Sequence, residues 1–123
     1  MRLEQSVLTR LAFLRRDADD LKWAVRHWAT RLGVKAPGVH VRAMRRKWAS
    51  ISTAGRLTLN PELLTLPRDV GEFVIVHELV HLLAPNHGKV FKGFMHAYLP
   101  DWEAREQRLQ TRGRSGARIS EFW

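Results

Sequence analysis

The chain has 123 residues, which is enough for one domain with a hydrophobic core and too few for two. Its 21 Lys and Arg residues outnumber its 12 Asp and Glu residues, so the formal net charge is +9. Such a charge indicates either a solvated basic surface or a polyanionic partner. The absence of cysteine excludes disulfides and cysteine-ligated metal sites, and no apolar run is long enough to span a membrane. We therefore expect a cytoplasmic protein without membrane association.

Two stretches near the N-terminus have the apolar spacing of helices, over residues 3–14 and 18–32. Acidic residues, Asp17 among them, precede the second stretch and favour a helix N-terminus there. Gly33 follows as a natural C-cap. The sequence therefore predicts N-terminal helices, either separate or continuous.

The next segment has the alternation of strands. Val39 and Val41 alternate with polar residues, and residues 46–52 and 56–60 have the pattern of a hairpin. We interpret Trp48 as a core residue, and Pro61 as the start of a short helical turn. The arm over residues 56–60 is the candidate edge strand, which could hold an extended peptide by main-chain hydrogen bonds.

A third pattern is apolar on nearly all sides from Val70 to Leu83, which is typical of a buried helix, and Pro85 ends it. Within it, residues 77–81 read His-Glu-Leu-Val-His and fit H-E-x-x-H. Two histidines four residues apart share one helix face and can bind one metal ion. Glu78 is rotated away from them and can act as a general base. The alternative is a pair of histidines satisfied by hydrogen bonds.

A catalytic zinc usually has three protein ligands and one open position. His87 follows the break at Pro85, so the chain can turn back and bring it to the same ion. The alternative is an exposed loop histidine. We expect Zn²⁺ bound by His77, His81 and His87, with Glu78 as the catalytic residue.

The C-terminal third contains two further helical patterns. Asn86 is expected to cap a helix with an apolar side, and residues 102–110 form the last expected helix. We therefore expect a single domain over residues 1–110. Residues 111–123 are expected to be a flexible basic tail, although Phe122 and Trp123 could dock back.

These motifs resemble those of the YgjP-like zincin metallopeptidases over about residues 44–110. The matching blocks are Arg46-Lys47-Trp48-Ala49-Ser50, Leu57-Thr58-Leu59-Asn60, His77-Glu78-Leu79-Val80-His81, Pro85-Asn86-His87-Gly88 and Phe91. The family usually has Arg-Trp-Gly-Ser-Cys in the first block, where this chain has Ala49 and Ile51 in place of the glycine and cysteine.

The resemblance implies an α+β fold with a small antiparallel or mixed sheet of about three strands. This sheet would pack on the motif helix, with N-terminal and C-terminal helices around them. It also implies that His77, His81 and His87 bind zinc, that Glu78 is the catalytic acid/base, and that the substrate is a peptide or protein. The histidine spacing is similar to that of the WLM and, more loosely, the SprT-like proteases, which act on proteins crosslinked to DNA.

One alternative to a peptidase is a nucleic-acid-associated zinc protein. It would be either a protease acting on DNA-bound proteins or a non-catalytic basic binding module. The densest basic cluster, which could grip phosphates or acidic peptide, comprises Arg42, Arg45, Arg46 and Lys47. A peptidase also needs a donor for its oxyanion. His96 and Tyr98 are candidates, although their helix position favours a packing role.

Overall fold

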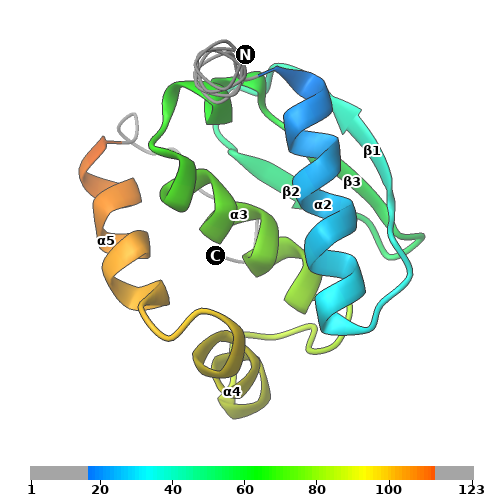
Figure 1. Ribbon diagram of the computed structural model, residues 1–123, viewed down its shortest axis with the longest axis vertical. Helices are drawn as coiled ribbons and strands as arrows, with labels where there is room; N and C mark the ends of the chain where they lie inside the picture. The colour runs from blue at the N-terminus through cyan, green and yellow to red at the C-terminus, as the bar shows by residue number, and fades with distance from the viewer. Residues whose placement is uncertain (1–16, 113–123) are drawn as a thin grey trace, which may run out of the picture.

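The computed structural model describes residues 17–112, which form a small sheet and a central helix with other helices packed around that helix (Figure 1). The elements are α2 (Ala18–Leu32), β1 (Gly38–Val41), β2 (Ala49–Ile51), β3 (Arg56–Leu59), a 3-10 helix (Pro61–Thr65), α3 (Arg68–Val80), α4 (Lys89–Tyr98) and α5 (Trp102–Arg112). The predicted α+β fold is confirmed. The predicted helix over residues 3–14 lies outside the described residues, as do Phe122 and Trp123.

The boundaries of α2 are those that the sequence predicts. The Asp17 carboxylate accepts hydrogen bonds from the backbone N–H groups of Asp19 and Asp20, and the Asp20 carboxylate accepts one from the Asp17 N–H. This reciprocal capping satisfies donors that a helix N-terminus leaves unpaired. Gly33 ends the helix at a φ of +72°, in the left-handed region that favours glycine.

The sheet is mixed, with strand order β1-β3-β2. β3 lies in the centre, paired in parallel with β1 and antiparallel with β2. The predicted hairpin is confirmed, but the prediction that residues 56–60 form the edge is wrong. β3 is central because β1, which precedes the hairpin in sequence, pairs with the second arm of the hairpin and not with the first. Within residues 17–112, the edges of the sheet are therefore β1 and β2.

α3 runs through the middle of the molecule and contacts α2, β2, α4 and α5 (Figure 1). Every residue from Phe73 to Val80 is buried, including His77 and Glu78. Trp48, which immediately precedes β2, is also buried in the core, as predicted. The helix that carries the motif is therefore the element around which the rest of the fold packs.

The α-helical hydrogen-bond pattern of α3 ends at Val80, and tighter turns continue the chain to Ala84. Leu82 and Leu83 are exposed, so the predicted burial does not extend to them. The prediction that Asn86 caps the next helix is also wrong. Its side chain accepts a hydrogen bond from the Gly88 N–H within a local turn, and Gly88 is the N-cap of α4.

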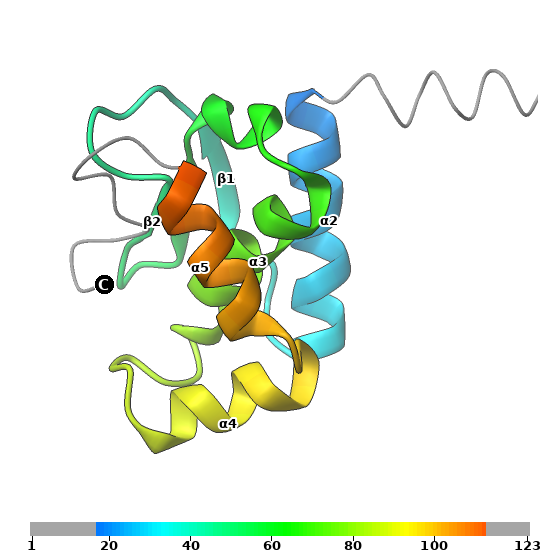
Figure 2. The same cartoon turned by 90° about the vertical axis from the view of Figure 1, so that its left-hand side faces the viewer.

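α4 lies at one end of the molecule, and α5 runs back from it beside α3 (Figure 2). A polar network ties α5 to the central helices. The Glu72 carboxylate of α3 accepts hydrogen bonds from the Trp28 indole at 3.1 Å and from the Arg105 guanidinium at 2.8 Å. Arg105 also donates to Asp101 and to the backbone oxygen of Asp69. One carboxylate thus joins α2, α3 and α5.

We expect Glu72→Ala to lower the free energy of unfolding by about 1–3 kcal/mol, because it leaves two donors without their acceptor. Urea denaturation followed by circular dichroism measures this change. Glu103→Ala removes a carboxylate whose side chain is 71% exposed, and it is the control that should move the midpoint little. Equal midpoint shifts in both variants would contradict a structural role for the network.

Candidate metal centre

His77 and His81 come from the same face of α3, as their spacing predicts. Their ring centroids are 4.8 Å apart, His77 is fully buried, and His81 is partly buried at the end of the helix. Because the surrounding helix is apolar and packed on all sides, these polar rings are placed in the core and not on a solvated surface. Their burial costs free energy unless the ring nitrogens find partners.

His87 reaches the same point from the loop between α3 and α4. Its Nε2 lies 3.2 Å from Nε2 of His77, and its ring centroid lies 4.6 Å from that of His81. The three histidines offer one nitrogen each, and these nitrogens all lie within 4.8 Å of one another. The structure therefore brings together the three histidines that the sequence selects.

Phe91 supports all three rings, a role that the sequence analysis missed. Its ring centroid lies 5.1 Å from that of His77, 4.9 Å from that of His81 and 4.8 Å from that of His87. The signal was a large apolar residue four positions after His87, on the first turn of α4. By packing against each imidazole, Phe91 restricts their orientations and connects α4 to the end of α3.

The histidine cluster fits a metal ion in protonation, and the nitrogens of His77 and His87 also fit one in distance. Two imidazole nitrogens on a tetrahedral zinc lie about 3.3 Å apart, given bond lengths of about 2.0–2.1 Å. Nitrogens as close as those of His77 and His87 repel each other unless a proton or a metal ion lies between them. Burial lowers the pKa of all three histidines, and the nearby rings lower that of His77 further. Neutral rings keep the lone pairs that a metal requires.

His81 shows the tautomer that metal binding needs. Its Nδ1 lies 3.2 Å from the backbone oxygen of Ala84, and because a carbonyl only accepts, Nδ1 carries the proton and donates. The other ring nitrogen, Nε2, is therefore a bare lone pair. That atom is buried and has no hydrogen-bond partner within residues 17–112. A metal ion would satisfy it, and this pattern of support is typical of histidine ligands.

Glu78 lies next to this cluster and is fully buried. Neither of its carboxyl oxygens has a hydrogen-bond partner in the described part of the chain, and Oε1 lies 3.7 Å from Nδ1 of His77. Burial raises the pKa of Glu78 to about 8, while the positive charge of Lys47 opposes this shift. In the absence of a metal ion, the carboxyl therefore holds a proton at neutral pH.

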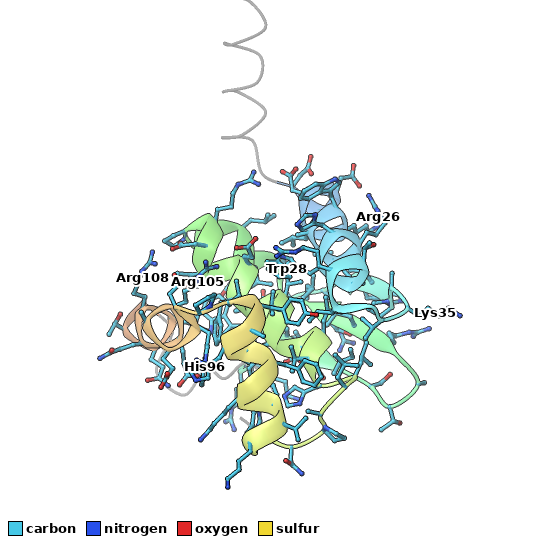
Figure 3. All side chains as sticks on the ribbon, turned by 60° about the horizontal axis from the view of Figure 1, so that its bottom comes forward. Arg26, Trp28, Lys35, His96, Arg105 and Arg108 are labelled. Carbon is cyan, nitrogen blue, oxygen red and sulfur yellow. The ribbon has the colours of Figure 1, made fainter. Side chains whose placement is uncertain are left out.

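The remaining predicted candidates lie apart from the cluster. His96 is an exposed residue of α4, on the side that faces α5, and its ring contacts Trp102 (Figure 3). Tyr98 is half-buried and packs against the core. In the basic cluster, Arg45 and Arg46 are exposed in the loop between β1 and β2. Only Lys47 of that cluster has an electrostatic link to the site, through Glu78.

Within residues 17–112, no helix combines the length and the apolar character that crossing a bilayer requires.

Comparison with known proteins identifies a family and several similar solved structures. A family model described as the YgjP-like metallopeptidase domain matches residues 5–112. The metallopeptidase zymogen abylysin of Pyrococcus abyssi is 25% identical, with a TM-score of 0.68 over 78% of this chain and 95% of that chain. The metallopeptidase zymogen jannalysin of Methanocaldococcus jannaschii is 22% identical, with a TM-score of 0.68 over 80% of this chain and 98% of that chain. A comparison with curated proteins finds no match.

With a chelator present, we expect the free energy of unfolding to fall as the pH rises from about 7 to about 8. The pKa of Glu78 is about 8 in the folded chain against an ordinary value near 4.5, so over this window the folded chain keeps a proton that the unfolded chain has lost. The contribution of Glu78 to this slope is at most about 1.4 kcal/mol per pH unit, and protons that still bind to histidines in the unfolded chain reduce the net slope. Below this window, the buried histidines give the opposite slope, because their pKa values are lowered.

Urea denaturation at several pH values measures this slope. Glu78→Gln removes the titrating carboxyl and should flatten the pH dependence over the same window. The same slope in wild type and variant would show that the carboxyl is already ionised in the folded, metal-free chain.

Proposed function

Because this chain belongs to the YgjP-like metallopeptidase family, and is therefore a hydrolase, we propose that it is a zinc peptidase with three histidine ligands. The ligands are His77, His81 and His87, and Glu78 is the general base. The observation that carries the proposal is the convergence of three neutral imidazoles beside a buried carboxyl that has no hydrogen-bond partner in the described part of the chain. This combination matches the ligand set and the adjacent base of catalytic zinc sites.

Zinc is the metal that these donors favour. Imidazole nitrogen suits zinc, copper, iron and nickel, whereas calcium and magnesium require oxygen ligands. The chain has no cysteine that could complete a structural site. In residues 17–112, the potential metal-binding group comprises three histidines only, which leaves a fourth position for the reaction. This observation supports a catalytic site over the alternative of a structural zinc in a nucleic-acid-binding module.

The chain's own residues have separate roles in the reaction. When bound, zinc would polarise the scissile carbonyl, acidify a water molecule and stabilise the ionised form of a neighbouring carboxyl. Glu78 would then accept the proton of the attacking water at a carboxylate oxygen and deliver it to the leaving amine. The apolar surroundings of Glu78 exclude bulk water, and the charge of Lys47 favours the carboxylate form.

β2 is the strand on which we place the substrate backbone, in place of the predicted β3. The backbone oxygen of Trp48, just before β2, accepts from the Asn60 N–H, and the N–H of Ser52, just after β2, donates to the Arg56 oxygen. In this register, Ser50 forms the hydrogen-bonded pair with Thr58 of β3. In an antiparallel ladder, the intervening residues point their backbone groups the other way. The N–H and C=O groups of Ala49 and Ile51 therefore face the outer edge, where an extended peptide can pair.

This edge starts beside the candidate site. β2 contacts α3, and Lys47, which precedes it, is close enough to Glu78 to influence its pKa. A peptide paired with β2 would therefore pass near the catalytic carboxyl. The basic loop over residues 42–47 leads into the same strand, which favours acidic or neutral residues in that part of the substrate.

We expect purified wild type to bind about one zinc ion per chain, and Glu78→Gln to keep the metal while losing at least about 100-fold in cleavage rate. His87→Ala should lose both, because two ligands hold zinc weakly. His40→Ala removes an exposed histidine of β1 and is the matched control. Metal is measured by mass spectrometry, and cleavage with a mixture of synthetic peptides.

Both solved relatives are zymogens, so the assay includes chains treated by limited proteolysis. Zinc-loaded wild type that cleaves no peptide before or after this treatment would contradict the proposed activity. Full zinc occupancy in His87→Ala would contradict the ligand assignment.

We also expect Ile51→Pro to raise KM about fivefold to tenfold with little change in kcat, because it removes one outward N–H from the edge of β2. Ser50→Pro instead removes an N–H that bonds to β3, so it should lower the melting temperature. If Ile51→Pro leaves KM unchanged while remaining folded, the substrate does not pair with this edge.

A further inference from the structure

A cavity of about 520 Å³ adjoins the metal centre, between α4 and α5. His87 and Phe91 form its wall on the side of the metal centre. The wall of α5 contributes Trp102, Glu103 and Glu106. In Figure 2, α4 and α5 are consecutive helices joined by a sharp corner, so the cavity lies in the angle between them. Its size is typical of sites that enclose a small ligand or a side chain.

The α5 wall is acidic, in contrast to the net charge of the whole chain. Glu106 is half-buried and has no ion pair or hydrogen bond with any residue in the described range. Burial raises the pKa of Glu106, and the charge of Glu103 raises it further. A cation placed between the two carboxylates would relieve this repulsion and stabilise both in their ionised forms. The contact of Glu103 is with the exposed His96, whose Nε2 lies 3.9 Å from Oε1. Lys92 also lines the cavity, from α4, but it forms no ion pair with either carboxylate.

Aromatic rings provide the remaining surface. Trp102 is only 6% exposed, and its indole N–H is a buried donor with no acceptor in the described part of the chain. His96 packs its ring against that of Trp102, with centroids 5.6 Å apart, and points from α4 toward α5 (Figure 3). The wall therefore combines aromatic faces, which attract cations, with carboxylates and a donor that lacks a partner.

We propose that this cavity is a specificity subsite that takes a lysine or arginine side chain of the substrate, next to the scissile bond. This inference rests on the proposed peptidase function. The aliphatic part of such a side chain packs on Phe91 and Trp102, while its charged end pairs with Glu106 and Glu103. Because His87 belongs both to the cavity wall and to the histidine cluster, the basic residue is held close to the bond that is cleaved. An acidic side chain would be repelled from the same place.

Peptide binding tests this subsite separately from catalysis. The full chain with Glu78→Gln, loaded with zinc, is titrated by calorimetry with acetyl-Ala-Arg-Ala-amide and with the same peptide carrying neutral citrulline. We expect arginine to bind about tenfold more tightly than its neutral isostere. Adding Glu103→Gln and Glu106→Gln should make the two dissociation constants equal. Adding Asp19→Asn, which removes one negative charge from the exposed start of α2, should leave the preference intact.

Three results overturn the proposal: neither peptide binds, both bind equally to the parent, or the preference survives the loss of both glutamates. Thermal melts of each variant exclude unfolding as the cause. Cleavage of the peptide mixture by wild type tests the proposed peptidase activity independently of the subsite. Cleavage without a preference for basic residues would support the peptidase function and contradict the subsite. A binding preference for arginine without any cleavage would support the basic-side-chain site and contradict the peptidase function.

Discussion

The structure depends on the burial of two polar side chains, His77 and Glu78, inside a helix that is otherwise apolar. Each would cost free energy in such a place if it were charged and unpaired. The fold avoids this cost by keeping the imidazole neutral and the carboxyl protonated until a cation arrives. The same burial raises the pKa of the carboxyl to about 8 and keeps the imidazole rings in their neutral form. The burial that lowers the stability of the metal-free chain therefore also produces the protonation states that the site needs for metal binding and proton transfer.

The surrounding elements hold this helix in a fixed position. α2 and α5 are joined to it through Glu72, which satisfies the Trp28 indole and the Arg105 guanidinium together. α4 is connected at the other end by Phe91, whose ring contacts all three imidazoles. Side-chain orientation at the histidine cluster therefore depends on two contacts far apart in sequence, one polar and one aromatic.

Local sequence patterns predicted the features that depend on neighbouring residues. The limits of α2 follow from Asp17 and Gly33, and the shared face of His77 and His81 follows from their spacing. The strand order did not follow, because alternation shows that a segment is a strand but not which partner it takes. Nor did the cavity between α4 and α5, since its walls meet only after the chain turns at the end of α4. The support that Phe91 gives is also a tertiary feature, although its position four residues after His87 was visible.

The division of the histidines between two elements has a consequence for assembly. His77 and His81 are fixed on one rigid helix, whereas His87 is carried by a loop whose shape depends on the local turn at Asn86. An ion bound by all three histidines would link the start of α4 to the end of α3 across that loop. It would act as a crosslink, as a disulfide does in other proteins, in a chain that contains no cysteine. Metal occupancy would then control how firmly α4 is held against α3, and therefore the shape of the cavity between α4 and α5.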